Sequence, residues 1–343
     1  MGKEKNFFMR VAMYYANNDV RVEDSSKPKI GEGELIVKVI ASGICGTDVV
    51  EWYRRDKVPL VLGHEIAGEI VEVGAGVTGY RSGDRISASH HVPCGMCHYC
   101  EMDHHSVCDT LRKTKFYPGG FAEFVRLPQI NIEKQGVYKI PEGVSYEEAT
   151  FTEPLACAIR GQRSGGYKKG QSLLVIGSGI SGLLHIQLAK TKGFGKILAT
   201  DINEHRLKAA LKFGADKVVH AKDFKEEKSA DFVILCTGAK SAFEQAFKAV
   251  DKGGTILVFA SAAEGYKYPL PINEFFWRNE VTVTSSYAAN PEEHLAALEL
   301  IRNKKINVKD MITHRFGLGD IQKGFKLVTD AKESIKVIIE PQR

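Results

Sequence analysis

Four of the seven cysteines of this 343-residue chain lie in one short segment. They are Cys94, Cys97, Cys100 and Cys108. This spacing lets four thiolates converge tetrahedrally on one zinc ion, and such a set leaves no coordination position for a substrate. A disulfide cluster is the alternative, but the chain begins with polar residues and shows no apolar signal segment for an oxidising compartment. We therefore expect a structural zinc site in a lobe at about residues 90–112.

The same segment argues against a nucleic-acid-binding zinc ribbon. Such a ribbon would carry a basic stripe beside its cysteines, whereas Glu101, Asp103 and Asp109 interrupt this one. The net charge of +5 is spread along the sequence and does not favour nucleic acid as a partner. No apolar run approaches the roughly 20 residues that cross a bilayer. These features predict a cytoplasmic protein that binds a small molecule, and neither nucleic acid nor membrane.

The pattern along the chain predicts an α/β fold with two domains. Up to about residue 150, short β-branched segments broken by glycine, such as 35–40 and 69–74, indicate an irregular and mostly β domain. From about residue 153, apolar strands alternate with helical patterns, which predicts a doubly wound parallel sheet. A helix around 291–302 and a last strand at 335–339 are expected to fold back onto the first domain. Residues before Met9 are interpreted as a short polar extension.

A glycine pattern in the second domain predicts a dinucleotide site. Gly177, Gly179 and Gly182 directly follow an apolar strand at 173–176, and a helix opens at Ile180. The glycines permit a tight turn and let the backbone N–H groups at the helix start approach a pyrophosphate.

An acidic residue about 20 positions further on indicates which dinucleotide binds. Asp201 closes the next strand, where it can accept hydrogen bonds from both ribose hydroxyls while its charge repels a 2′-phosphate. We therefore expect NAD rather than NADP. Arg206 could instead bind an NADP phosphate, although beside Asp201 it is better placed to cover the adenine.

A second zinc site is indicated by thiol, imidazole and carboxyl groups in the first domain. Cys45 stands in the run Gly-Ile-Cys-Gly-Thr-Asp, and His64 and Glu65 follow Gly63. A catalytic zinc takes three protein ligands and leaves one position for water or substrate. Glu153 could supply the third ligand.

Together these motifs resemble those of zinc-dependent medium-chain dehydrogenases, in the branch of sorbitol (L-iditol) 2-dehydrogenases and threonine dehydrogenases. The matching motifs lie in order along nearly the whole chain: residues 43–48, residues 63–65 with Gly68, Gly74 and Val77, the four-cysteine segment, residues 153–157 and the glycine pattern. The resemblance implies a GroES-like catalytic domain of residues 1–152 and 288–343, and a Rossmann NAD-binding domain of residues 153–287. It also implies a structural and a catalytic zinc, and a homodimer or homotetramer.

The resemblance assigns roles to individual residues. Cys45 and His64 become ligands of the catalytic zinc. Of Glu65 and Glu153, one would bind the zinc directly and the other through the bound water, and the sequence leaves open which does which. Cys157, one helical turn beyond Glu153, is a rival ligand.

The expected reaction is hydride transfer from a secondary alcohol to NAD, giving the ketone. Thr47 matches the hydroxyl that passes on the alcohol proton, and its alternative role is that of a turn threonine. Val50 stands where relatives often have a relay histidine, which leaves the relay beyond Thr47 open. Ser285 lies in the stretch that passes the nicotinamide, where polyol dehydrogenases often place an arginine. The substrate therefore stays open between a polyol, sugar alcohol or sugar acid and a threonine-type amino alcohol, and a catalytically inactive dinucleotide-binding protein is the alternative of another class.

The histidines beside the four cysteines are not expected to bind the structural zinc ion. Four thiolates complete the structural ion, so His90 and His91 are expected at the surface or at a hinge.

Overall fold

The computed structural model describes residues 8–343 and divides into two compact units. The first unit contains the described residues up to Glu153, together with Ala289–Asn303 and Val308–Arg343. The second contains Pro154–Ala288 and Lys304–Asn307. The polar extension expected before Met9 lies almost wholly outside the described residues. No helix among the described residues is long and apolar enough to cross a bilayer.

The first unit is built mainly from strands. They are β1 (Phe8–Ala16), β2 (Asp19–Ser26), β3 (Leu35–Gly43), β4 (Leu60–Val61), β5 (Glu65–Val73), β6 (Arg85–Ala88), β7 (Phe124–Leu127), β8 (Val137–Lys139), β15 (Ile312–Gly317) and β16 (Lys336–Glu340). One sheet has the order β15-β16-β3-β5-β6-β8, with β7 also paired to β3, and a smaller sheet has the order β2-β1-β4. The last strand of the chain, β16, thus pairs with β3 from near its start.

The helices of this unit are short except near the C-terminus. They are η1 (Gly46–Val49), α1 (Glu51–Arg54), α2 (His98–Glu101), η2 (His105–Val107), α3 (Asp109–Lys113), α4 (Gln129–Glu133), α5 (Tyr146–Ala149), α11 (Pro291–Arg302), η3 (Lys309–Met311), η4 (Leu318–Asp320) and α12 (Ile321–Asp330). Helix α11 has the predicted bounds. Asn290 caps it, since its side chain accepts the N–H of Glu293 and the Glu293 carboxylate accepts the N–H of Asn290.

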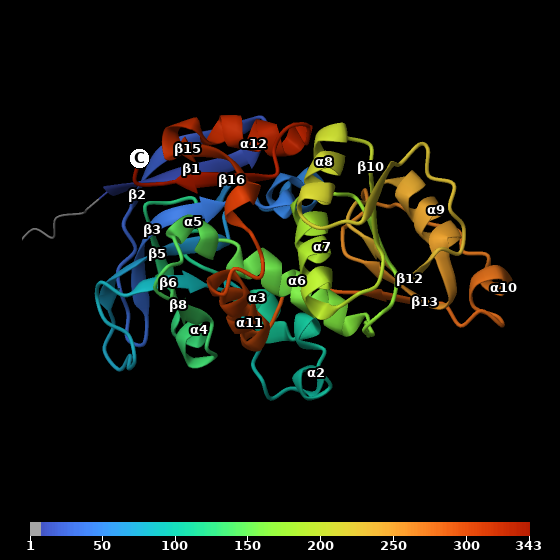
Figure 1. Cartoon of the computed structure of the whole chain (residues 1–343). Coiled ribbons are helices and arrows are strands. Elements are labelled where there is room, and N and C mark those ends of the chain that lie inside the picture. Colours follow the sequence, from blue (N-terminus) through green and yellow to red (C-terminus); the bar gives the residue numbers. More distant parts are fainter. Residues whose placement is uncertain (1–7) are drawn as a thin grey trace, which may run out of the picture. The chain divides into compact units, whose positions relative to one another are not determined.

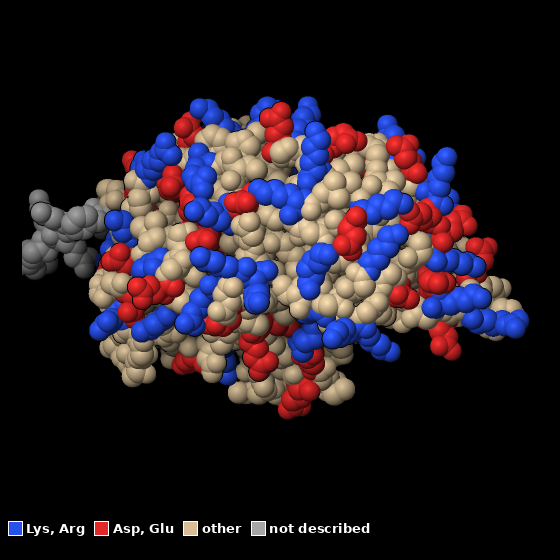
Figure 2. All heavy atoms as spheres, viewed as in Figure 1, with Lys and Arg blue, Asp and Glu red and all other residues tan. Residues whose placement is uncertain are grey.

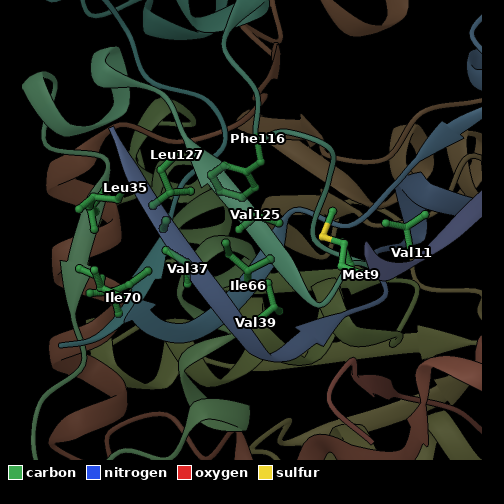
Figure 3. Close-up of a cluster of buried hydrophobic side chains, with 14 residues drawn as sticks. Met9, Val11, Leu35, Val37, Val39, Ile66, Ile70, Phe116, Val125 and Leu127 are labelled. Atoms are coloured by element: carbon green, nitrogen blue, oxygen red, sulfur yellow. The ribbon is translucent and has the colours of Figure 1, made fainter. Parts of the chain in front are cut away.

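The core of the first unit follows from alternation along its central strands. In β3, Leu35, Val37 and Val39 have no exposed surface, and they pack with Ile66 and Ile70 of β5 (Figure 3). Because successive side chains of a strand point to opposite faces, this alternation gives β3 one continuous apolar face. That packing fixes the register of β3 against β5, on which the metal-ligand residues depend.

The second unit is the predicted parallel α/β sheet. Its strands are β9 (Leu173–Ile176), β10 (Ile197–Asp201), β11 (Lys217–His220), β12 (Ala230–Leu235), β13 (Val250–Val258) and β14 (Thr282–Ser285), in the order β11-β10-β9-β12-β13-β14. Its helices are α6 (Thr152–Ser164), which begins in the first unit, α7 (Ile180–Lys192), α8 (Glu204–Lys212), α9 (Lys240–Ala249) and α10 (Ile272–Phe275). All strand pairs are parallel. The doubly wound parallel sheet that was predicted for the second domain is confirmed.

Helices cover both faces of this sheet. Leu174 and Val233 pack with Ala246 and Phe247 of α9, whereas Val175 lies beneath Gly182 of α7. Neighbouring residues of one strand therefore face different helices, and Figure 1 shows α7 and α9 on opposite sides of the sheet. Helix α9 ends at Ala249, and β13 begins directly at Val250.

Charged side chains of both signs are mixed over the molecular face that Figure 2 shows. No basic stripe of the kind that binds nucleic acid is visible on that face.

Candidate metal centres and cofactor site

The four cysteines of the lobe converge as predicted. The sulfur atoms of Cys94, Cys97, Cys100 and Cys108 all lie within 4.8 Å of one another. The Sγ atoms of Cys94 and Cys100 are 3.9 Å apart, and those of Cys97 and Cys100 are 3.6 Å apart. A disulfide would need about 2.0 Å. Tetrahedral ligands at about 2.3 Å from zinc lie about 3.8 Å from each other, so the residues present fit a zinc ion.

Backbone N–H groups lower the pKa of two of the four thiols, whereas burial raises the pKa of Cys100 to about 12. Burial disfavours the charged form of Cys108, but the N–H of Cys94, 3.4 Å from its sulfur, and further backbone donors lower the pKa of Cys108 to about 6. The N–H of Met96 acts in the same direction on Cys94 and lowers its pKa. Gly95, at φ +76°, turns the chain so that these donors point at sulfur.

A second cluster comprises Cys45, His64 and Glu65, whose candidate ligand atoms also lie within 4.8 Å of one another. Strand pairing brings them together, because Gly43 at the end of β3 lies opposite Glu65 at the start of antiparallel β5. The residues that continue β3 therefore meet those that precede β5. One thiol, one imidazole and one carboxyl group suit a zinc ion and leave a fourth position free of protein ligands.

The buried side chain of Asp48 contacts two members of this cluster. Its side chain has no exposed surface, its Oδ2 accepts the N–H of Cys45 at 3.0 Å, and its Oδ1 lies 3.5 Å from Nδ1 of His64. With Nδ1 turned towards a carboxylate, the Nε2 atom of His64 is left for a metal. Arg54 adds a positive charge 3.8 Å from Oδ1 of Asp48 and donates to the carbonyl of Thr47 at 3.2 Å.

Electrostatics make His64 a strong base when no metal is bound. Burial alone would lower the pKa of His64, but the charges of Asp48 and Cys45 outweigh it and raise the pKa well above its usual value. Burial likewise opposes the charge of Asp48, while His64 and Arg54 lower the pKa of that carboxyl. A metal that binds His64 must displace a proton, so metal uptake should weaken as the pH falls.

Two further predicted residues, Glu153 and Thr47, relate differently to the three-residue cluster. Among residues 8–343, the carboxyl group of Glu153 does not join the ligand atoms of Cys45, His64 and Glu65. Thr47 is exposed, and its Oγ1 donates to Cys45 Sγ at 3.3 Å, so its hydroxyl lies directly beside the candidate metal ligand.

His90, which was expected at the surface or at a hinge, is partly exposed and packs against two other histidines. Its ring centroid is 4.7 Å from that of His64 and 3.7 Å from that of His91, and its Nδ1 atom is buried. Burial lowers the pKa of His90 well below its usual value. The cysteine pattern gives no signal for this contact. It arises because His64 precedes β5, His90 follows β6, and these two strands pair.

The glycine pattern adopts the geometry that the cofactor prediction requires. Gly177 has φ +93°, and a side chain at Gly182 would overlap the carbonyl of Gly177. Gly179 is the N-cap residue of α7, and no side chain caps this helix, so its first N–H groups remain available to an anionic ligand. The guanidinium of Arg206 lies 3.6 Å from where a Cβ of Gly179 would be.

Asp201 closes β10 next to this turn. Its Oδ2 accepts the N–H of Ser178 at 2.7 Å, and its Oδ1 accepts the N–H of Asn203 at 2.9 Å. Each carboxylate oxygen can accept a further hydrogen bond, so the side chain is fixed in place and still available to a ribose. Ser285 ends β14 at the same carboxyl-terminal edge of the parallel sheet, where such folds bind their ligands near the switch between β9 and β12.

Comparison with known proteins identifies the family. Residues 31–142 match the alcohol dehydrogenase GroES-like domain, and residues 181–303 match the zinc-binding dehydrogenase domain. The chain is 31% identical to "Probable D-xylulose reductase A" of Aspergillus clavatus, over 94% of each chain. The chain belongs to the zinc-dependent medium-chain dehydrogenase family. It is therefore an oxidoreductase that works with zinc and a nicotinamide dinucleotide.

Two further relatives show the range within this family. The L-threonine 3-dehydrogenase of Pyrococcus abyssi is 32% identical, over 89% of this chain and 90% of its own. A zinc-binding dehydrogenase from Sinorhizobium meliloti 1021, whose crystal structure holds NADP, is 26% identical with a TM-score of 0.86, over 98% of this chain and 100% of its own. Membership in the zinc-dependent polyol and alcohol dehydrogenases was predicted and is confirmed.

Proposed function

We propose that this dehydrogenase oxidises a secondary hydroxyl of a polyol, sugar alcohol or sugar acid to the ketone, with NAD as the hydride acceptor. The observation that carries the proposal is the cluster of Cys45, His64 and Glu65, which offers three ligand types and, among residues 8–343, no fourth protein ligand. A relative named as a D-xylulose reductase supports a polyol and its ketose as the substrate pair.

The chain's own residues divide the work of the reaction. Cys45, His64 and Glu65 would hold the catalytic zinc, and Glu153 would act through the water or substrate on that ion. A bound zinc would lower the pKa of an alcohol hydroxyl, and a bound nicotinamide would accept the hydride from the adjacent carbon. The Thr47 hydroxyl, 3.3 Å from Cys45 Sγ, would accept the alcohol proton and pass it on.

Binding of the cofactor is assigned to the second unit. The backbone at Gly177, Gly179, Ile180 and Gly182 would hold the pyrophosphate, Asp201 the ribose, and Arg206 the adenine face. Ser285 would lie beside the nicotinamide. The buried charge of Asp201 supports NAD over NADP, although one similar structure holds NADP.

The proposal includes a domain assignment and an assembly. The first unit would be the catalytic domain and the second the cofactor domain. We also propose a homodimer or homotetramer acting in the cytoplasm, where the four cysteines stay reduced and able to hold zinc. Strand β14 is the last in its sheet order, which would suit pairing with a second copy.

A threonine-type amino-alcohol dehydrogenase is the second candidate, because the chain is 32% identical to an L-threonine 3-dehydrogenase. A panel of polyols, sugar acids and amino alcohols at saturating NAD, followed by NADH absorbance, separates the two. The proposal expects the highest kcat/KM on a polyol or sugar acid. The highest value on L-threonine would favour the second candidate, and tight NADH binding without turnover on any alcohol would indicate an inactive protein.

A further inference from the structure

A buried lysine lies against the candidate metal cluster. Lys336, the first residue of β16, is 1% exposed, and its ammonium forms an ion pair with Oε2 of Glu65, which is also 1% exposed. The same ammonium donates to the carbonyl of Ile44 at 3.2 Å and lies 5.7 Å from the ring centre of Phe151. Burying a charge is unfavourable unless it is paired and hydrogen-bonded. Both conditions are met here by Glu65, itself a proposed metal ligand, and by Ile44, which directly precedes the proposed ligand Cys45.

Contacts of the neighbouring residues fix the position of the Lys336 side chain. Strand β16 holds Ile44 twice, since the N–H of Ile44 donates to Val337 at 3.0 Å while its carbonyl accepts from Lys336. Ile44 directly precedes Cys45. Any side chain at Gly43 would overlap both Glu65 and Lys336, so the glycine leaves the space that the ion pair occupies. One ammonium thus links the loop of the thiol ligand to the carboxylate ligand.

A carboxylate can bind zinc through one oxygen or through both. Oε2 of Glu65 is engaged by Lys336, which leaves Oε1 for a metal. The positive charge of Lys336 also offsets one of the two negative charges that Cys45 and Glu65 bring to the cluster. A zinc ion held there would keep more of its positive charge for a substrate oxygen.

We propose that Lys336 is a positioning residue that restricts Glu65 to one metal-binding oxygen and thereby keeps a coordination position open for the alcohol. The inference rests on the proposed function, because it assumes that Cys45, His64 and Glu65 hold the catalytic metal. Without Lys336, the second oxygen of Glu65 is free to occupy the position that the substrate needs.

The experiment is cobalt substitution of the full-length protein. Four-coordinate Co²⁺ absorbs visible light strongly, and a fifth ligand weakens its d–d bands. Lys336→Met should retain two metal ions per chain, show weaker d–d bands than the wild type, and lose roughly 10-fold or more in alcohol kcat/KM, as changes around metal ligands commonly do. The dissociation constant for NADH should not change. The four-cysteine site adds the same background to each variant, so difference spectra report the other site.

Further variants control this test. Lys139→Met removes another ion pair of the first unit, in which Nζ of Lys139 lies 2.8 Å from Oδ2 of Asp84. This variant should leave the spectrum unchanged. Glu65→Gln offers only one oxygen, so adding Lys336→Met to Glu65→Gln should not weaken the bands further. If Lys336→Met does not fold, Lys336→Leu, which likewise offers no donor to Oε2 of Glu65, replaces it with the same expectation.

The outcomes separate the two proposals. A wild-type spectrum without a cobalt signal beyond the four-cysteine site would contradict the proposed function. A normal wild-type spectrum that is identical in the folded Lys336 variant, with full metal content, would overturn the inference alone. A purely structural role for Lys336 would lower the unfolding temperature and leave the d–d bands as they are.

Discussion

Asp48 Oδ1 lies 3.5 Å from Nδ1 of His64 and has no exposed surface. The carboxylate is thus a buried support that sets the ring orientation and the tautomer of a candidate metal ligand. It also accepts the N–H of Cys45, so one side chain positions two of the three ligands.

Replacing this support should weaken the metal site. We expect Asp48→Asn to lower the affinity for the second zinc by roughly 10- to 100-fold, because the His64 ring loses a charged partner. Competition with a chromophoric chelator measures that affinity. The exposed Asp56→Asn, eight residues along the chain, is the matched control and should bind zinc like the wild type. Equal affinities in the two variants would show that Asp48 does not support His64.

The four-cysteine lobe should hold a separate ion that takes no part in turnover. Cys97→Ser removes one of four thiolates, so elemental analysis should find about one zinc per chain in place of two. The midpoint of thermal unfolding should fall, because the lobe loses the ion that holds its chain together. Cys236→Ala serves as the control and should retain both ions. A Cys97→Ser protein with two zinc ions would contradict the assignment of the lobe.

Cofactor choice should depend on the charge of Asp201. Asp201→Asn keeps the size of the side chain and removes the repulsion of a 2′-phosphate, so the ratio of kcat/KM for NAD over NADP should fall roughly tenfold, or about 1.4 kcal/mol. Steady-state kinetics with both cofactors measures this ratio. The exposed Asp223→Asn should leave it unchanged. A wild-type protein that uses NADP as well as NAD would remove the electrostatic basis for this expectation.

Acid should destabilise the second unit through His185. Burial lowers the pKa of His185 to about 3, whereas an unfolded chain has a histidine pKa of about 6.5. Between these values the unfolded state takes up a proton that the folded state excludes, so this residue costs about 1.4 kcal/mol of stability per pH unit as the pH falls. Its contribution does not change above pH 6.5 or below pH 3.

Comparing variants isolates this effect from the loss of metal in acid. His185→Leu should unfold in urea with a weaker dependence on pH between 6.5 and 4 than the wild type. The exposed His205→Leu should follow the wild type. The same slope for His185→Leu and the wild type would show that the ring is charged in the folded protein.

Much of the fold and two metal clusters could be predicted because their signals are local. Gly177, Gly179 and Gly182 lie within six residues, and the four cysteines lie within fifteen. His64 and Glu65 are adjacent, so once β3 pairs with β5 they meet Cys45 together. In these cases, residues that are close in the sequence are also close in space, so their spacing predicts the site.

Other parts of the site depend on contacts that no local pattern shows. Lys336 meets Glu65 across 271 positions, and only the pairing of β16 with β3 brings it there. A lysine within the apolar run 335–339 was the available signal. Asp48 was visible as part of a motif, but its burial and its contact with His64 required the turn of η1. His90 was expected at the surface or at a hinge because four cysteines complete the structural zinc site, and its contact with His64 depends on the pairing of β5 with β6.

The most direct test of the account is NADH formation as zinc is returned to the metal-free protein. We predict no turnover with one zinc per chain in the four-cysteine lobe, and turnover of a polyol or sugar acid that grows in proportion to the second zinc. Cys45→Ser should bind the first ion and show no turnover at any zinc concentration. Full activity with a single zinc held by the four cysteines, or wild-type activity in Cys45→Ser, would contradict the central claim.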